Sequence, residues 1–203
     1  MKPESSSAER HDRRQELTLA AFHAIAEKGF EGLRVRDVAA QVGINGATLH
    51  HYFSTKEDLI RGVVEYTINR LRGIMITYPE ANMAPREQLR HHVARLYDLM
   101  QGEPELFVVL TEVSLRARRM PVLGFLVEQN RVWHDMVMSM IVRGIAEGSW
   151  PAEIDADGAA WALITLMEGL SSWATAAKDR ADKVMSQLDR WLASNRTDDA
   201  SRS

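Results

Sequence analysis

Residues 35–53, VRDVAAQVGINGATLHHYF, constrain the fold of this chain more than any other stretch. Val38, Ala39 and Val42 recur at the spacing of one helical face, which predicts a short amphipathic helix. Gly43 then stands where a helix ends in the left-handed conformation that glycine adopts most easily. The small side chain of Ala39, four residues before Gly43, permits a second helix to approach closely. The pattern predicts a helix followed by a tight turn.

A second short helix is predicted directly after this turn. Asn45 is a favourable N-cap, and Leu49 and Tyr52 lie on the inner side of the helix it begins. Its outer side carries only small or hydrogen-bonding groups, namely Gly46, Ala47, Thr48, His50 and His51. Two short helices joined by such a turn form a helix-turn-helix, whose second helix can lie in a DNA major groove. The residues fit equally a helical hairpin inside any all-α protein.

The segments around the motif resemble the N-terminal domain of the TetR family of transcriptional regulators. The resemblance rests on EKGFEGL (27–33), VRDVAAQVGI (35–44) and ATLHHYFSTKEDLI (47–60), with a weaker similarity at residues 144–170. It implies an all-α fold with an N-terminal three-helix helix-turn-helix domain, followed by a larger helical bundle for ligand binding and dimerisation. It also implies double-stranded DNA, a small-molecule effector and a second copy of the chain as partners.

A length of 203 residues suits one large domain or two small ones. We expect a disordered tail over 1–8, the DNA-binding domain over 9–55, the effector and dimerisation domain over 56–195, and a polar tail over 196–203. Helices are predicted near 9–28, 56–78, 85–101, 105–118, 121–147, 155–177 and 180–194, and no strand pattern is present. Prolines fall close to the ends of most of these segments.

Composition excludes several classes of protein. The chain has no cysteine, so it forms no disulfide, and no apolar run reaches the roughly 18–20 residues of a membrane span. The N-terminal segment lacks the apolar core of a signal peptide, so we expect a cytoplasmic protein. The pairs His50-His51 and His91-His92 do not suggest a metal site, because adjacent helical side chains diverge. No metal, cofactor or enzymatic activity is expected.

Net charge gives weak support to DNA binding. The whole chain carries a formal charge of -3, and residues 1–62 contain nine basic and nine acidic side chains. Any attraction for phosphates therefore depends on where the charges lie, not on their sum.

The predicted DNA contacts are Arg36, Asn45, Gly46, Ala47, Thr48, His50, His51, Tyr52 and Lys56. Arg36 has the reach for a bidentate contact with guanine, and Ala47 suits a thymine methyl group. Lys56 begins a helix, where its ammonium and free backbone N–H groups suit a phosphate. Relatives commonly carry a long polar side chain where this chain has Gly46, and a Ser or Thr cap where it has Arg34.

The second part of the chain contains many methionines, whose flexible side chains adapt to irregular ligands but also fill ordinary cores. The candidate effector pocket comprises Met75, Met100, Phe107, Glu112, Arg116, Trp133, Met136 and Trp161. A stripe of small residues near 158–176 permits close helix approach within a subunit or between subunits. The candidate dimer interface comprises Ala162, Thr165, Gly169, Ser172, Trp173 and Ala176.

Together these observations predict a sequence-specific transcriptional regulator, most simply a repressor that a small molecule releases from a palindromic operator. The alternative is an all-helical binding or scaffold protein whose helix-turn-helix serves protein contacts. Only the regulator predicts DNA binding with a steep dependence on salt.

Overall fold

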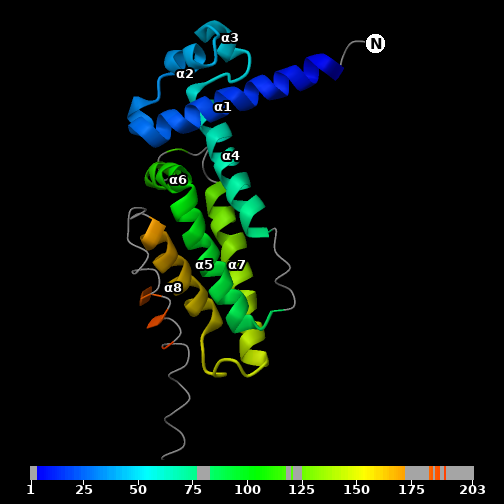
Figure 1. The fold of residues 1–203 in the computed structure, drawn as a ribbon, viewed down its shortest axis with the longest axis vertical. Helices are drawn as coiled ribbons and strands as arrows, with labels where there is room; N and C mark the ends of the chain where they lie inside the picture. Colours follow the sequence, from blue (N-terminus) through cyan, green and yellow to red (C-terminus); the bar gives the residue numbers. More distant parts are fainter. Residues whose placement is uncertain are drawn as a thin grey trace, which may run out of the picture. The chain divides into compact units, whose positions relative to one another are not determined.

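The computed structural model describes residues 4–76, 83–117, 120, 125–171, 183–184, 186–187 and 190. Its helices are α1 (Glu4–Gly32), α2 (Val35–Gln41), α3 (Gly46–His50), α4 (Lys56–Ile76), α5 (Pro85–Gly102), α6 (Pro104–Ala117), α7 (Phe125–Ala146) and α8 (Ala156–Ser171) (Figure 1). No strand occurs among these residues. The predicted all-α class is confirmed.

The chain divides into two compact units. Unit 1 comprises Met1–Ile74 with Glu105–Leu126, and unit 2 comprises Met75–Pro104 with Val127–Ser203. Unit 1 therefore holds α1 to α4 and α6, whereas α5, α8 and nearly all of α7 belong to unit 2. Unit 1 thus includes most of α4 and α6 from Glu105 onward, and the predicted domain boundaries stay a prediction.

The first helix is longer than expected. It begins at Glu4 rather than Glu9, so helix extends into the range that was expected to be disordered. Gly29 interrupts it with φ +68° and ψ 178°, and a short further turn continues to Gly32. The sequence placed the break correctly at Gly29, since a left-handed backbone is costly for any residue with a Cβ atom.

The core of unit 1 forms where α1, α2, α3 and α4 bury their apolar faces. Its fully buried side chains include Leu17, Ile25, Leu33, Val38, Leu49, Phe53, Leu59, Val63 and Val64. Gly62 of α4 is packed closely here, because a Cβ atom at that position would lie 3.1 Å from Cε1 of Phe53. Of the predicted inner residues of the helix-turn-helix, Val38, Ala39 and Leu49 are buried in this core, whereas Val42 and Tyr52 are half-buried.

Unit 2 is built from helices that run alongside one another, with α5, α7 and α8 visible in Figure 1. Its buried side chains include Leu89, Val93, Leu96, Leu99, Met100, Val137, Met140, Ile141, Ile164 and Met167. Trp150, in the loop after α7, packs against Gly144, where a Cβ atom would lie 2.2 Å from the indole ring. Pro85 stands in the first turn of α5, where the missing N–H costs nothing.

Among the described residues, no helix combines the length and the apolar character that crossing a bilayer requires.

Candidate nucleic-acid interface

The turn between α2 and α3 is fixed by its glycine. The backbone N–H of Gly43 donates to the carbonyl of Ala40 at 3.1 Å, and that of Ile44 donates to Ala39 at 2.9 Å. Gly43 has φ +73°, and nothing lies within 4 Å of the place where its Cβ atom would be. The glycine is therefore needed for its backbone conformation and not for lack of space. This confirms the predicted role of Gly43 as the end of the first short helix.

Asn45 begins α3, as the sequence predicted. Its Oδ1 accepts the backbone N–H of Thr48 at 2.7 Å and the Thr48 hydroxyl at 3.0 Å. This side-chain cap satisfies a backbone donor that the helix leaves without an internal partner. α2 has no such cap, since Arg34 precedes it without a side-chain hydrogen bond to the helix.

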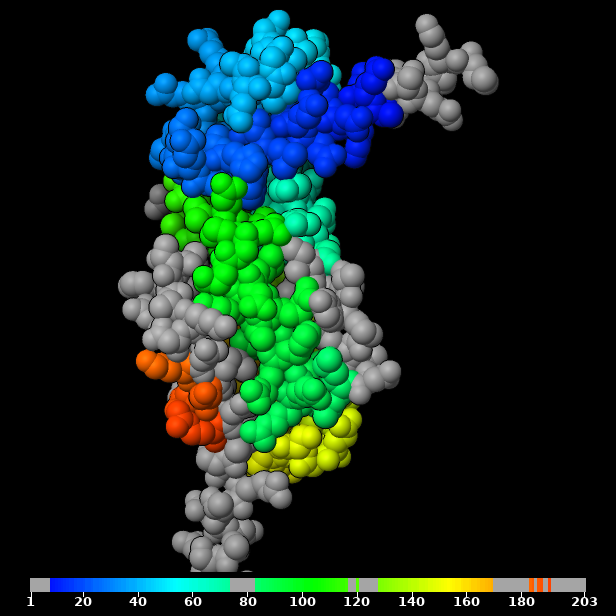
Figure 2. All heavy atoms as spheres, viewed as in Figure 1, coloured from blue at the N-terminus to red at the C-terminus, as the bar shows by residue number. Residues whose placement is uncertain are grey.

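The two sides of α3 differ in burial. Leu49 is buried against α2 and its neighbours, together with Ala39. Ala47, His50 and His51 are exposed. In the space-filling view, the light-blue atoms of α2 and α3 form an open surface on one side of the dark-blue α1 (Figure 2). The predicted division into an inner and an outer side is therefore present.

The other predicted contact residues lie around this surface. Arg36 and Asn45 are exposed, whereas Gly46, Thr48, Tyr52 and Lys56 are half-buried. Gly46 adjoins Arg36, because a Cβ atom on Gly46 would lie 3.9 Å from Cγ of Arg36. Lys56 is the first residue of α4.

Two arginines of α1 hold the motif in place, and sequence reasoning missed both. Arg14 donates to the carbonyl oxygen of Tyr52, and its guanidinium lies 4.0 Å from the centre of the Phe53 ring. Arg13 donates to the carbonyl of Val42 at 3.4 Å, which ties α1 to the end of α2. Arg14 stands three residues before Leu17 on the buried side of α1, a spacing that places the two side chains on one face.

Thr55 is a further residue that sequence reasoning did not single out. Its Oγ1 accepts the backbone N–H of Asp58 at 3.0 Å and so caps the start of α4 next to Lys56. The spacing of a threonine three residues before an acidic residue was the available signal.

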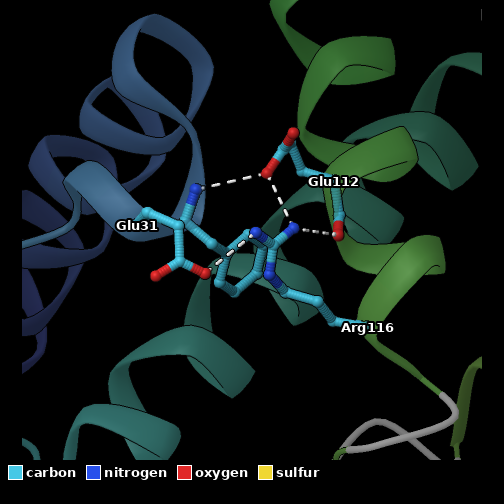
Figure 3. Close-up of polar contacts among 4 residues, drawn as sticks. Glu31, Glu112 and Arg116 are labelled. Carbon is cyan, nitrogen blue, oxygen red and sulfur yellow. Dashed lines mark hydrogen bonds and ion pairs between the residues drawn. The ribbon is translucent and has the colours of Figure 1, made fainter.

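Glu112 and Arg116, predicted as polar anchors of an effector pocket, lie in unit 1 against the end of α1 (Figure 3). Oε2 of Glu112 accepts the backbone N–H of Phe30 at 3.2 Å, directly after the break at Gly29. Arg116 binds Glu112 at 2.9 Å and Glu31 at 3.2 Å, with its guanidinium 4.8 Å from the centre of the Phe30 ring. Glu112 thus provides an acceptor for the backbone N–H at the break in α1. The role of Glu112 and Arg116 toward an effector stays a prediction.

The remaining predicted effector residues are divided between the two units. Phe107 is buried in unit 1, whereas Met100, Trp133, Met136 and Trp161 belong to unit 2. The side chain of Met75 lies outside the described residues. Glu168 of unit 2 has its pKa raised by burial, although the hydrogen bond that it accepts from the Asn130 amide at 3.3 Å acts in the opposite direction.

Trp133 is held by a histidine that the sequence did not indicate. Its Nε1–H donates to Nε2 of His92 at 3.0 Å, linking α7 to α5 inside unit 2. Burial, with a smaller contribution from neighbouring His91, lowers the pKa of His92 from 6.5 to about 4. His92 is therefore neutral at physiological pH, as its role as an acceptor requires.

The predicted dimer residues that the structure describes are all exposed on α8. Ala162, Thr165 and Gly169 share one side of this helix with the exposed indole of Trp161. The Trp161 ring stacks on buried His134, with 4.3 Å between the ring centres. Ser172, Trp173 and Ala176 lie outside the described residues.

Across the described part of the chain, no group of three or more histidines and carboxylates is arranged to hold a metal ion.

Comparison with known proteins identifies relatives for both parts of the chain. The family model described as bacterial regulatory proteins, tetR family, matches residues 17–63, and that of the BetI-type transcriptional repressor, C-terminal, matches residues 85–196. The HTH-type transcriptional repressor KstR2 of Mycolicibacterium smegmatis is 25% identical over 145 residues, which cover 71% of each protein.

Solved structures share the fold. A TetR transcription regulator from Haloarcula marismortui has a TM-score of 0.79 at 22% identity, covering 91% of this chain and 98% of that one. AibR, solved in complex with isovaleryl coenzyme A and operator DNA, has a TM-score of 0.68 at 16% identity, covering 89% and 97%.

Proposed function

The chain belongs to the TetR family of bacterial transcriptional regulators, and we propose that it acts as a homodimer that places α3 of each subunit in successive major grooves of a palindromic operator. It is a ligand-responsive, DNA-binding repressor. Two recognition helices must lie about 34–36 Å apart, which is one helical turn of DNA, to enter successive major grooves on one face of the duplex.

The observation that carries this proposal is the two-sided character of α3. Leu49 anchors the inner side in the core, whereas Ala47 and His50 are exposed on the outer side. A helix held by one buried side chain, an N-cap and a tight turn presents its outer side as a rigid surface, which groove recognition requires.

The residues around the start of α4 suit contacts with DNA phosphates when α3 lies in the groove. Lys56 and the backbone N–H groups at the start of α4 that Thr55 does not cap suit one phosphate oxygen, and His51 and Tyr52 lie in the loop just before. Replacing Lys56 by alanine should weaken specific and nonspecific DNA binding alike and reduce the salt slope by about one. Loss of binding to one operator sequence alone would instead assign a base contact to Lys56.

The second copy is proposed to dock on the α8 face, defined as Trp161, Ala162, Thr165 and Gly169. The Thr165 hydroxyl donates to the Trp161 carbonyl at 2.8 Å, so this polar group stays satisfied when the face is dehydrated. Nothing lies within 4 Å of a Cβ atom built on Gly169. Small side chains beside one large aromatic group suit close packing of a partner helix.

Light scattering on the double variant Ala162→Leu with Gly169→Leu tests this interface. Added bulk should lower the dimer fraction, whereas Ala94→Leu, at an exposed position of α5, should leave it unchanged. Equal dimerisation of both variants would show that the second copy does not dock on the α8 face.

An effector is proposed to act through the helical second part of each subunit. Such a ligand lowers operator affinity only by the difference between its affinities for the DNA-binding and released conformations. AibR was solved with an acyl coenzyme A, and an acyl thioester is therefore a sensible first class of compound to screen for release of DNA.

Recovery of bound sequences from random duplex DNA, followed by titration at two salt concentrations, tests the proposed function directly. A regulator should select one inverted repeat and lose affinity steeply as salt rises. Selection of no sequence, with a shallow salt slope, would favour a helical scaffold protein that binds no operator.

A further inference from the structure

The break in α1 places a backbone N–H group against a carboxylate of α6. At Gly29 the backbone leaves the helical region, with φ +68° and ψ 178°. A helix end of this kind leaves backbone groups without partners in their own helix. Oε2 of Glu112 accepts the N–H of Phe30 at 3.2 Å, and it lies 3.4 Å from the place of a Cβ atom on Gly29 (Figure 3). The Glu112 carboxylate therefore fits directly against the break.

Arg116, one turn further along α6, holds this carboxylate in place. Its Nη1 donates to Oε2 of Glu112 at 2.9 Å, and its Nη2 donates to Oε1 of Glu31 at 3.2 Å. The side chains of Arg116 and Glu112 are only 26% and 27% exposed, whereas that of Glu31 is 93% exposed. Hydrogen bonds to charged groups contribute most where water competes least with them. The contacts that run from Arg116 through Glu112 to Phe30 are therefore stronger than the contact with Glu31.

The residues held by these contacts lead directly into the helix-turn-helix. Phe30 and Leu33 are 5% and 2% exposed, so the segment after the break is anchored in the core of unit 1. α2 begins shortly afterwards, at Val35. The direction in which the chain leaves Gly29 thus determines where α2 lies, and the local turn at Gly43 carries that direction on to α3.

A second contact between α1 and α6 is weaker. Nδ1 of His23 lies 3.0 Å from Oε2 of Glu105, but both side chains are more than half exposed. Polar contacts between exposed side chains contribute little, because water and salt screen them. Glu105 and Glu112 are two helical turns apart, so they lie on the same side of α6. Of these two contacts, the one at the break is the stronger restraint on α1.

We propose that Glu112, held by Arg116, is a positioning residue for operator binding: it fixes the helix-turn-helix relative to α6 and so sets the distance between the two recognition helices of a dimer. The inference rests on the proposed function, and it gives Glu112 and Arg116 a role in positioning rather than in holding an effector. α6 follows α5 of unit 2 after the single residue Glu103. A helix-turn-helix fixed on α6 is thus connected, by a short link, to the part of the chain where the second copy is proposed to dock.

The test measures affinity for two operators that differ only in the separation of their half-sites. The first is the inverted repeat that the wild-type protein selects from random duplex DNA. The second has one base pair inserted between its half-sites, which adds about 3.4 Å. The wild type should bind the first operator much more tightly than the second.

Glu112→Ala should bind the first operator about 10-fold more weakly than the wild type does, because loss of a hydrogen bond to a charged group corresponds to about that factor. It should also prefer the first operator less strongly over the second, since its recognition helices are no longer held at one distance. Glu112→Gln keeps an acceptor for the Phe30 N–H and should restore most of the affinity and the preference.

The direction of the effect distinguishes positioning from a change of charge. Removal of an acidic side chain should by itself favour binding to a polyanion, so weaker operator binding by Glu112→Ala is the opposite of a charge effect. Affinity for a duplex of scrambled sequence should not fall, and its salt slope should stay the same, since no phosphate contact is removed. An equal loss of affinity for the operator and the scrambled duplex would overturn the proposal.

Glu105→Ala is the matched control. It removes a carboxylate from the same side of α6, together with the contact to His23, and should bind both operators as the wild type does. Equal losses of operator affinity in Glu105→Ala and Glu112→Ala would overturn the assignment to the break. Circular dichroism checks that each variant is folded at the temperature of the binding measurement.

These outcomes separate the inference from the function on which it rests. If the wild-type protein selects no sequence, the proposed function fails, and the inference fails with it. If the wild type selects an inverted repeat and folded Glu112→Ala keeps both its affinity and its preference for one spacing, only the role of Glu112 fails. A lower melting temperature of Glu112→Ala in that case would show that its contact with Phe30 serves stability alone.

Discussion

The helix-turn-helix of unit 1 and the helices of unit 2 are stabilised in different ways. In the helix-turn-helix, the hydrogen bonds of the turn and the helix caps join residues three to five positions apart, as at Gly43, Asn45 and Thr55, and Arg13 and Arg14 of α1 add only two contacts from further away. In unit 2, the buried polar contacts join distant residues, as His92 does with Trp133 across 41 positions. A recognition surface built from local contacts can keep its shape while helices elsewhere rearrange, which a ligand-responsive regulator requires.

The largest effect should come from removing an apolar anchor, because burial outweighs local hydrogen bonds even in the helix-turn-helix. Leu49 is 1% exposed, so Leu49→Ala should lower the free energy of unfolding by about 2–5 kcal/mol. Ala47→Ser, on the exposed side of the same helix, should change it by less than about 0.5 kcal/mol. Urea unfolding measures both, and similar values for the two variants would mean that α3 is not anchored through its inner side.

The next effect concerns His92, which is buried in unit 2. Its pKa is about 4 in the folded state and 6.5 in the unfolded chain, so the unfolded chain binds more protons as the pH falls below about 6.5. Stability should therefore fall between pH 6.5 and 4, by about 2 kcal/mol at pH 5 from this group alone.

His92→Gln keeps an acceptor for the Trp133 indole and should remove this part of the acid sensitivity. Trp133→Phe should leave most of it, because burial is the main cause of the lowered pKa. Unfolding free energies at pH 7.5 and pH 5 for the three proteins measure the difference. The same acid sensitivity in His92→Gln and the wild type would show that His92 is not held neutral by burial.

A smaller effect distinguishes backbone conformation from packing. Gly43→Ala should lower the free energy of unfolding by about 1–2 kcal/mol, because the added Cβ atom is strained at φ +73° although space is available. Gly73 is exposed within α4, also with nothing within 4 Å of an added Cβ atom, and there the same substitution should stabilise the protein by about 0.5–1 kcal/mol. Thermal unfolding measures whether Gly43→Ala lowers and Gly73→Ala raises the melting temperature. Two shifts in the same direction would contradict the left-handed conformation of Gly43.

The smallest effect is that of the N-cap. Asn45→Ala leaves the Thr48 backbone N–H without its side-chain partner and should lower the free energy of unfolding by about 1 kcal/mol. Asn45→Ser should recover most of that loss, since a serine hydroxyl can accept the same N–H. Should Ala and Ser prove equal at this position, the cap would contribute little beyond what water supplies.

The sequence by itself determined the all-α class, the positions of most helices, the break at Gly29, the turn at Gly43 and the cap at Asn45. Each of these depends on backbone conformation or on a hydrogen bond between near neighbours, and residue type restricts both directly. The inner and outer sides of α3 were predictable for the same reason, because helical periodicity assigns them.

Tertiary structure alone decided which distant side chains meet. Arg14 binds the Tyr52 carbonyl, Glu112 binds the backbone at the break in α1, and Trp133 binds His92. Glu112 illustrates the limit: its sequence context permits a pocket anchor or a surface charge, and only its distance to Phe30 reveals a third role. Such pairings follow from packing of whole helices, whose free energy sums many weak contacts that no local pattern encodes.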